Sequence, residues 1–174
     1  GTGKTSFSES ILFQSGIINR KGTVEDRNTV SDFTEIEQEK GFSVFSALMN
    51  CEWKNTKINF IDTPGLDDFV GETLAAMQVA DASVIFINGA NSIEFQTNII
   101  FERAKELKKP ISFLVNNLDI ENVDFDKIHN DLIGTFGSKA VAVQYPLNTG
   151  AGFSEIIDLL KMKLLKFSSD GKYI

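Results

Sequence analysis

The feature that most constrains this chain is an apolar segment that ends in an acidic residue and passes directly into a tight turn. Residues 58–61 predict a strand, and Asp62 is followed by Thr63, Pro64 and Gly65. At a strand end, this arrangement can place a carboxylate beside Mg²⁺ and a glycine amide beside a phosphate oxygen. Pro-Gly marks turns in any fold, so the interpretation depends on further motifs in the right order.

The first of these motifs, Gly3-Lys4-Thr5, lies at the start of the sequence. It reads as the second half of the phosphate-binding loop G-x-x-x-x-G-K-[ST], and we expect the first half and a preceding strand to lie before Gly1. Lys4 can reach the β- and γ-phosphates, and the Thr5 hydroxyl can bind Mg²⁺. A glycine-capped loop and helix without a ligand is the alternative. The residues of this loop predicted to bind nucleotide are Gly1, Gly3, Lys4, Thr5 and Ser6.

The second motif follows a predicted strand over residues 111–115. Asn116 and Asp119 are separated there by Asn117 and Leu118. A carboxylate can accept hydrogen bonds from N1–H and N2–H₂ of guanine together, and a side-chain amide can contact O6 or N7. The pair therefore favours guanine over adenine, and Asn116, Asn117 and Asp119 are predicted to bind the base.

Between these motifs, residues 21–40 are polar and charged, without a sustained period of 2 or 3.6. A long irregular segment in a compact domain is either disordered or functional, and here it suggests a switch that responds to Mg²⁺ and the γ-phosphate. Ser43 follows it and is the candidate for a second hydroxyl ligand, although a residue that simply begins a strand is the alternative. The predicted Mg²⁺ ligands are Thr5, Ser43 and Asp62.

The rest of the chain alternates strands with helices. An antiparallel hairpin is predicted over 44–53 and 57–61, and strands over 83–88, covered on both faces, and over 141–146. Helical spacing of apolar residues predicts helices through 7–12, 70–77, 93–107, 125–136 and 156–164. Together these elements predict an α/β fold of the three-layer P-loop NTPase type, with a mostly parallel sheet, helices on both faces and one antiparallel hairpin.

Composition excludes some classes of function. The formal net charge of −7 argues against a broad nucleic-acid-binding face, because such binding depends largely on neutralising phosphates. The charge does not exclude a small local contact with RNA. No apolar stretch reaches the length of about 18 residues that a membrane span needs, so we expect a soluble, cytoplasmic protein. The single cysteine, Cys51, is interpreted as a packed or idle thiol. The single histidine, His129, is interpreted as having a structural or solvent-exposed role.

With these motifs placed, the chain resembles the G domain of translational GTPases, and most closely that of the elongation factor G family. Residues 37–44, with the sequence EQEKGFSV, look like the family's E-Q-E-R-G-I-T-I switch segment. Residues 142–146 and 156–163 look like the family's passage from the nucleotide-binding core into an insertion. The resemblance implies a GTP-binding core over 1–147 and the start of that insertion over 148–174, with further domains beyond.

The resemblance also implies what the protein binds. Its ligands would be GTP or GDP with Mg²⁺, and its partner would be the ribosome, contacted by the full-length factor at ribosomal RNA near the GTPase centre. It would act while tRNA and mRNA are translocated. No membrane or DNA partner is implied.

Two departures from the family pattern bear on hydrolysis and affinity. The family turn is D-T-P-G-H, whose histidine positions the attacking water, and Leu66 occupies that place here although leucine neither donates nor accepts a hydrogen bond. The family base motif is N-K-x-D, and Asn117 is too short to replace the lysine stem along the base. Ser43 in place of threonine keeps the hydroxyl. The catalytic positions are therefore Lys4, Gly65 and the degenerate Leu66.

These departures favour a GTP-binding translocation factor in which hydrolysis is weak or lost. The alternatives are a fully active GTPase and a ribosome protection or release factor related to elongation factor G. A generic P-loop ATPase fits least, because Asn116 and Asp119 suit guanine.

Overall fold

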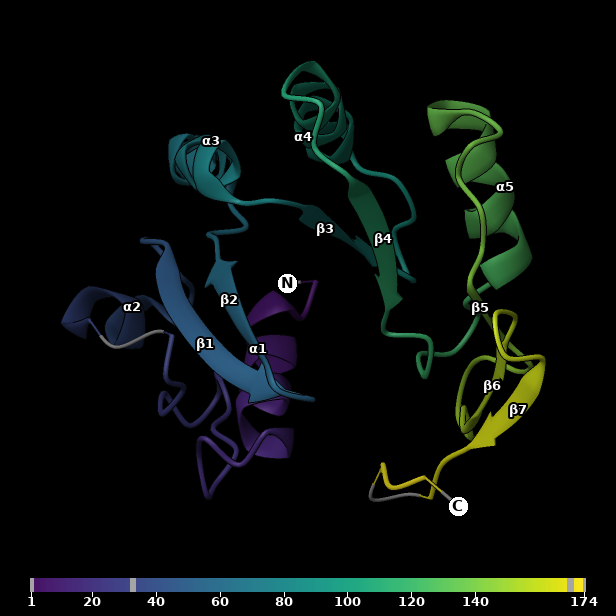
Figure 1. The fold of residues 1–174 in the computed structure, drawn as a ribbon, viewed down its shortest axis with the longest axis horizontal. Helices are drawn as coiled ribbons and strands as arrows, with labels where there is room; N and C mark the ends of the chain where they lie inside the picture. The colour runs from purple at the N-terminus through teal and green to yellow at the C-terminus, as the bar shows by residue number, and fades with distance from the viewer. Residues whose placement is uncertain (1, 32–33, 169–170, 174) are drawn as a thin grey trace. The chain divides into compact units, whose positions relative to one another are not determined.

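The computed structural model describes residues 2–31, 34–168 and 171–173, and the chain has an α/β fold (Figure 1). It divides into two compact units, which we describe separately: residues 1–86 with 98–113, and residues 87–97 with 114–174. The elements in chain order are α1 (Lys4–Gln14), α2 (Glu35–Lys40), β1 (Ala47–Trp53), β2 (Thr56–Asp62), the 3₁₀ turn η1 (Asp67–Phe69), α3 (Val70–Val79), β3 (Ser83–Asn88), α4 (Phe95–Glu106), β4 (Ile111–Asn116), α5 (Phe125–Phe136), β5 (Gln144–Pro146), β6 (Glu155–Asp158) and β7 (Lys163–Lys166).

The predicted hairpin is confirmed as β1 and β2 in the first unit. The strands pair antiparallel from Ala47 opposite Asp62 to Trp53 opposite Thr56. Lys54 and Asn55 form the turn with φ of 50° and 60°, and two successive positive values give the turn twist that matches the strands. The register of the hairpin brings Asp62 to the end of β2, where the Thr-Pro-Gly turn begins.

The core of the first unit lies between α1 and this hairpin. Leu12, Ala47 and Met49 are buried together, and Ile18 and Phe60 pack against them. Alternate residues of β1 are buried, so the strand presents one face to the helix. The helix predicted through residues 7–12 is confirmed as α1, which runs from Lys4 to Gln14.

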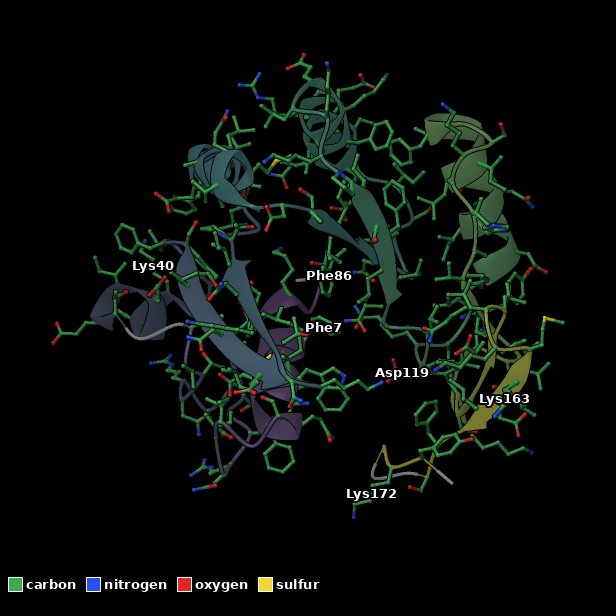
Figure 2. The ribbon with its side chains drawn as sticks, in the orientation of Figure 1. Phe7, Lys40, Phe86, Asp119, Lys163 and Lys172 are labelled. Carbon is green, nitrogen blue, oxygen red and sulfur yellow. The ribbon has the colours of Figure 1, made fainter. Side chains whose placement is uncertain are left out.

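The predicted strand over 83–88 is confirmed as β3, which pairs with β4. Ile85 and Ile87 are buried whereas Val84 is 53% exposed. The face opposite Ile85 and Ile87 is therefore covered in part, since Val84 is exposed whereas Phe86 is half-buried. In the first unit, the ring of Phe7 from α1 contacts the ring of Phe86 edge to face, with centroids 5.3 Å apart (Figure 2).

The segment predicted to be irregular contains a short helix, α2. Its N-cap Thr34 accepts a hydrogen bond from the Glu37 amide, and the Glu37 carboxylate accepts one from the Thr34 amide. This reciprocal pair is a capping box, and Gly41 ends the helix with φ of 72°. Apolar periodicity failed to predict the helix because six residues are too few to show it, whereas the Thr-x-x-Glu spacing would have indicated it.

The helix predicted over 156–164 is wrong. In the second unit, β5, β6 and β7 form a three-stranded antiparallel sheet, in which Ile156 lies opposite Leu165 and Ile157 opposite Leu164. The Asp158 carboxylate accepts hydrogen bonds from the amides of Leu160 and Lys161 in the β6–β7 turn. Asp and Asn side chains commonly stabilise turns in this way, and the apolar spacing of four residues arose from a hairpin rather than from a helix.

The helix α5 of the second unit follows the sequence closely. The Asp124 carboxylate caps α5 by accepting from the Lys127 amide, and Ile128 and Leu132 bury one face. His129 stacks on the ring of Phe125 at a centroid distance of 6.2 Å, which agrees with its interpretation as structural. Among the described residues, no helix combines the length and apolar character that crossing a bilayer requires.

Replacement of Leu12 by alanine tests the core between α1 and the hairpin. Leu12 is 2% exposed, so we expect the substitution to lower the free energy of unfolding by about 2–5 kcal/mol through lost burial and a residual cavity. The neighbouring Phe13 is 43% exposed and provides the matched control, with a smaller loss expected for Phe13→Ala. Urea unfolding followed by circular dichroism measures both. Equal losses of unfolding free energy in Leu12→Ala and Phe13→Ala would contradict the assignment of the core to the space between α1 and the hairpin.

Candidate functional site

The phosphate-binding loop leads directly into α1. Gly3 is the N-cap and has φ of 85°, a left-handed conformation that glycine adopts without strain. Lys4 is the first helical residue, with Thr5 and Ser6 in the first turn, so their backbone amides lie at the positive end of the helix dipole. Gly1, which was also predicted to bind nucleotide, lies outside the described residues.

The turn after β2 meets this loop at Lys4. A Cβ atom added to Gly65 would lie 2.6 Å from Lys4 Nζ, which is closer than real Cβ atoms approach other atoms. Lys4 Nζ also donates to Thr2 Oγ1 at 3.4 Å. A side chain at residue 65 would displace only the flexible end of Lys4, so the short distance shows proximity and does not by itself require glycine. The structure thus brings together Lys4 and Gly65, the two residues predicted to lie beside phosphate oxygens.

The two hydroxyl groups predicted to bind Mg²⁺ also meet. Thr5 Oγ1 and Ser43 Oγ are 3.4 Å apart, although 38 residues separate them in the sequence. Neighbouring ligands on an octahedral Mg²⁺ with bonds of about 2.1 Å lie about 3 Å apart, so this spacing fits the ion. Asp62, the third predicted ligand, is 5% exposed at the end of β2.

This donor set suits a metal that is shared with a ligand. Among the described residues, no group of three or more His, Cys, Asp or Glu side chains could hold a metal ion. Mg²⁺ at phosphate sites is usually bound by one or two protein groups, with phosphate oxygens and water completing the octahedron. The hydroxyls of Thr5 and Ser43 and the carboxylate of Asp62 are oxygen ligands of the kind that Mg²⁺ takes. An ion that arrived with a nucleotide would neutralise phosphate charge there.

The segment that carries Ser43 is held by the carboxylate of Glu37. Glu37 is 1% exposed, and its Oε1 accepts from the amides of Val44 at 3.0 Å and Phe45 at 3.1 Å. Its Oε2 accepts from Thr34 Oγ1 at 2.7 Å and from the Thr34 amide at 3.2 Å. The Glu37 side chain thus connects the start of α2 to the residues that directly follow Ser43 through hydrogen bonds.

The ionisation of Glu37 follows from these contacts. Burial raises the pKa of the carboxyl group, but the hydrogen bonds from the Thr34 hydroxyl and from the amides of Phe45, Val44 and Thr34 together outweigh burial. The pKa is therefore held below its ordinary value of 4.5. Glu37 is the anchoring group that the sequence interpretation missed, and the capping box was its available signal.

A second buried carboxylate holds the other end of this segment. Glu9 of α1 is 1% exposed, and its two oxygens accept from the amides of Gly22 and Val30. These two amides lie 13 and 21 residues along the chain from Glu9. No local pattern in the sequence indicates this role for Glu9.

Aromatic and backbone contacts complete the attachment near Ser43. Phe42 lies 6.4 Å from Phe69, centroid to centroid, and the Ser46 amide donates to the Glu72 carboxylate at 2.9 Å. The residues on both sides of Ser43 are therefore joined to the segment that follows the Thr-Pro-Gly turn.

The residues predicted to bind the base lie in the second unit. Asn116 is the last residue of β4, Asn117 has φ of 59°, and Asp119 is exposed in the loop that follows (Figure 2). Asn117 Nδ2 donates to Asn88 Oδ1 at 3.2 Å, and the Gly89 amide donates to the Asn116 carbonyl at 2.8 Å. The end of β3 therefore supports this loop, which the sequence interpretation did not predict.

Leu66 occupies the position that was interpreted as degenerate. It directly follows Gly65, which lies against Lys4, and its side chain is 44% exposed. Its carbonyl accepts from the Phe69 amide at 3.0 Å, so the backbone of Leu66 begins η1. The side chain brings no donor or acceptor to this place.

Comparisons with known proteins show what the whole chain is similar to. The model of the family described as the Elongation factor Tu GTP binding domain matches residues 1–168. The chain is 34% identical over 98% of its length to an elongation factor G-like protein of Thermotoga maritima, and 32% identical over 97% to an elongation factor G 2 of Borreliella burgdorferi. A crystal structure of a Thermus thermophilus protein matches the entire chain with a TM-score of 0.92 and 26% identity. The chain spans 24–25% of the length of the two relatives and 26% of the crystallised chain.

Replacement of Glu37 by glutamine tests the anchor beside Ser43. The amide Nε2 cannot accept the hydrogen bonds from Thr34, so we expect the free energy of unfolding at pH 7 to fall by about 1–3 kcal/mol. Because the pKa of folded Glu37 lies below 4.5, the stabilisation is present above that pH and is lost as the pH falls through the folded pKa. The difference in free energy of unfolding between the native protein and Glu37→Gln, measured by urea unfolding, should therefore be smaller at acidic pH than at pH 7.

Glu39, which is exposed on the same helix, supplies the control for this measurement. Glu39→Gln should change the stability by no more than about 0.5 kcal/mol at either pH. A loss at pH 7 in Glu37→Gln that persisted undiminished in acid would contradict the role of the ionised carboxylate.

Proposed function

Because the chain belongs to the Elongation factor Tu GTP binding domain family of translational GTPases, we propose that it is the nucleotide-binding part of an elongation factor G-like protein. The proposed protein binds GTP or GDP with Mg²⁺ and acts in the cytoplasm on the ribosome, where it contacts ribosomal RNA during movement of tRNA and mRNA. The chain spans about a quarter of its curated relatives, so the action of the whole protein is part of this proposal.

We further propose that hydrolysis of GTP by this protein is slow. The observation that carries this part is the position of Leu66, which directly follows the glycine that lies against Lys4. A group at this place could orient the attacking water, but leucine can neither accept its proton nor hold it by a hydrogen bond. GTP then acts mainly as a ligand that selects a conformation, and the bound state persists.

A fully active GTPase is the second candidate. It is favoured by the contact between Gly65 and Lys4 and by the spacing of Thr5 and Ser43, since phosphoryl transfer depends largely on positioning and on charge stabilisation. These groups supply phosphate binding in either case. The two candidates differ only in whether another group orients the water.

Phosphate release from GTP by the full-length protein on ribosomes separates the two candidates. We expect slow release by the native protein and an increase of about 10²- to 10⁴-fold in Leu66→His, because the imidazole can accept a proton and orient water. Leu66→Met, which keeps the size and apolar character, is the matched control and should leave the rate unchanged. Fast release by the native protein would support the active GTPase and reject slow hydrolysis.

Nucleotide competition tests the identity of the ligand. We expect GTP to displace fluorescent GDP from the full-length protein at concentrations more than about 100-fold lower than ATP, because the wrong base leaves polar groups unpaired. Removal of Mg²⁺ with EDTA should weaken GTP binding. Asp119→Ala should reduce the discrimination, whereas Asn91→Ala, at an exposed residue of the second unit, should not. Displacement by ATP at similar concentrations would contradict the guanine assignment.

A further inference from the structure

We propose that Asn88, at the end of β3, is a positioning residue for recognition of the base, and that it acts through Asn117. This inference rests on the proposed binding of a guanine nucleotide and names a residue outside the predicted site. It also accounts for an asparagine at the place where the family motif has lysine. Both residues belong to the second unit, so the inference involves contacts within one compact body.

The oxygen of the Asn88 side chain connects two loops. Asn88 Oδ1 accepts from Asn117 Nδ2 at 3.2 Å and from the Ala90 amide at 3.0 Å. The first contact crosses from the end of β3 to the loop after β4, and the second fixes the turn in which Asn88 itself lies. The Asn88 side chain is therefore held in one orientation while it holds Asn117.

The backbone of the same turn provides a second, independent contact. The Gly89 amide donates to the Asn116 carbonyl at 2.8 Å. A Cβ atom at residue 89 would lie 2.9 Å from that carbonyl oxygen and 3.1 Å from the carbonyl oxygen of Asn117, so only glycine allows the two loops to come this close. The approach of the backbones brings the two asparagine side chains within hydrogen-bonding distance.

The conformation of Asn117 explains why the contact matters. Its φ of 59° is left-handed, a region that asparagine tolerates better than lysine does. Its side chain donates to Asn88. The neighbouring Asn116 and Asp119 are the residues proposed to contact the base. The hydrogen bond thus orders the loop in advance, which lowers the entropy lost when the nucleotide binds.

A double-mutant cycle on the full-length protein tests the proposal. Dissociation constants for GDP are measured for the native protein, Asn88→Ala, Asn117→Ala and the double variant. Each single variant should bind GDP roughly 2- to 12-fold more weakly, the range expected for one hydrogen bond. The double variant should be no weaker than the weaker single variant. Losses that multiply would show that the residues act independently and would overturn the proposal.

A second readout separates positioning from simple loss of stability. Inosine diphosphate lacks the 2-amino group that a carboxylate such as Asp119 can accept from, so the ratio of the IDP and GDP dissociation constants reports how well the loop reads the base. This ratio should fall in Asn88→Ala and return in Asn88→Asp, whose carboxylate still accepts from Ala90 and Asn117. An unchanged ratio in Asn88→Ala would assign Asn88 a structural role only and overturn the proposal.

GDP binding by the native protein distinguishes a failure of this proposal from a failure of the proposed function. Absence of GDP binding by the native protein would reject the proposed function and leave the contact to be tested by hydrogen exchange. The Gly89 amide should then exchange faster in Asn117→Ala than in the native protein, since loss of the side-chain contact loosens the two loops. Unchanged exchange at Gly89 would overturn the role of the Asn88–Asn117 contact.

Discussion

The arrangement of the first unit depends on two carboxylates that are buried without a basic partner in the described contacts. A buried charge is costly unless hydrogen bonds replace its water, and Glu9 and Glu37 obtain these bonds from backbone amides and from the Thr34 hydroxyl. The segment between α1 and β1 has little apolar periodicity and could not be ordered by burial alone. The two carboxylates replace an apolar core there, and Ser43 meets Thr5 because the chain on either side of it is held.

Prediction from the sequence was most accurate where one local pattern determines structure. The hairpin, β3, β4 and α5 were predicted because alternation, apolar runs and helical spacing each lasted several residues. Short elements failed for physical reasons. In 156–164 an apolar spacing of four suited a helix and a hairpin equally, and the turn formed by Asp158 favoured the hairpin. The six residues of α2 gave no period, and only the capping box marked them.

In the candidate site too, residues in local motifs could be predicted from the sequence, whereas residues with remote partners could not. Lys4, Thr5, Asp62 and Gly65 could be predicted as site residues because phosphate and Mg²⁺ binding require these residue types at fixed positions in short motifs. The supporting residues were missed because their partners are remote in sequence: Glu9 reaches 13 and 21 residues along the chain, and Asn88 reaches 29. Such contacts depend on how the elements pack. The two departures from the family pattern also differ, because Asn117 has a partner in Asn88 whereas Leu66 presents an apolar side chain.

The buried carboxylates have a consequence for the thermodynamics of ligand binding. A switch that is disordered without its ligand loses conformational entropy on binding and buries surface, which gives a large negative heat-capacity change. Here the chain around Ser43 is ordered by Glu9 and Glu37, so much of that entropy is lost when the protein folds. Nucleotide affinity and folding stability then share one source of free energy. Substitutions far from any phosphate can therefore weaken binding by loosening the ends of this segment.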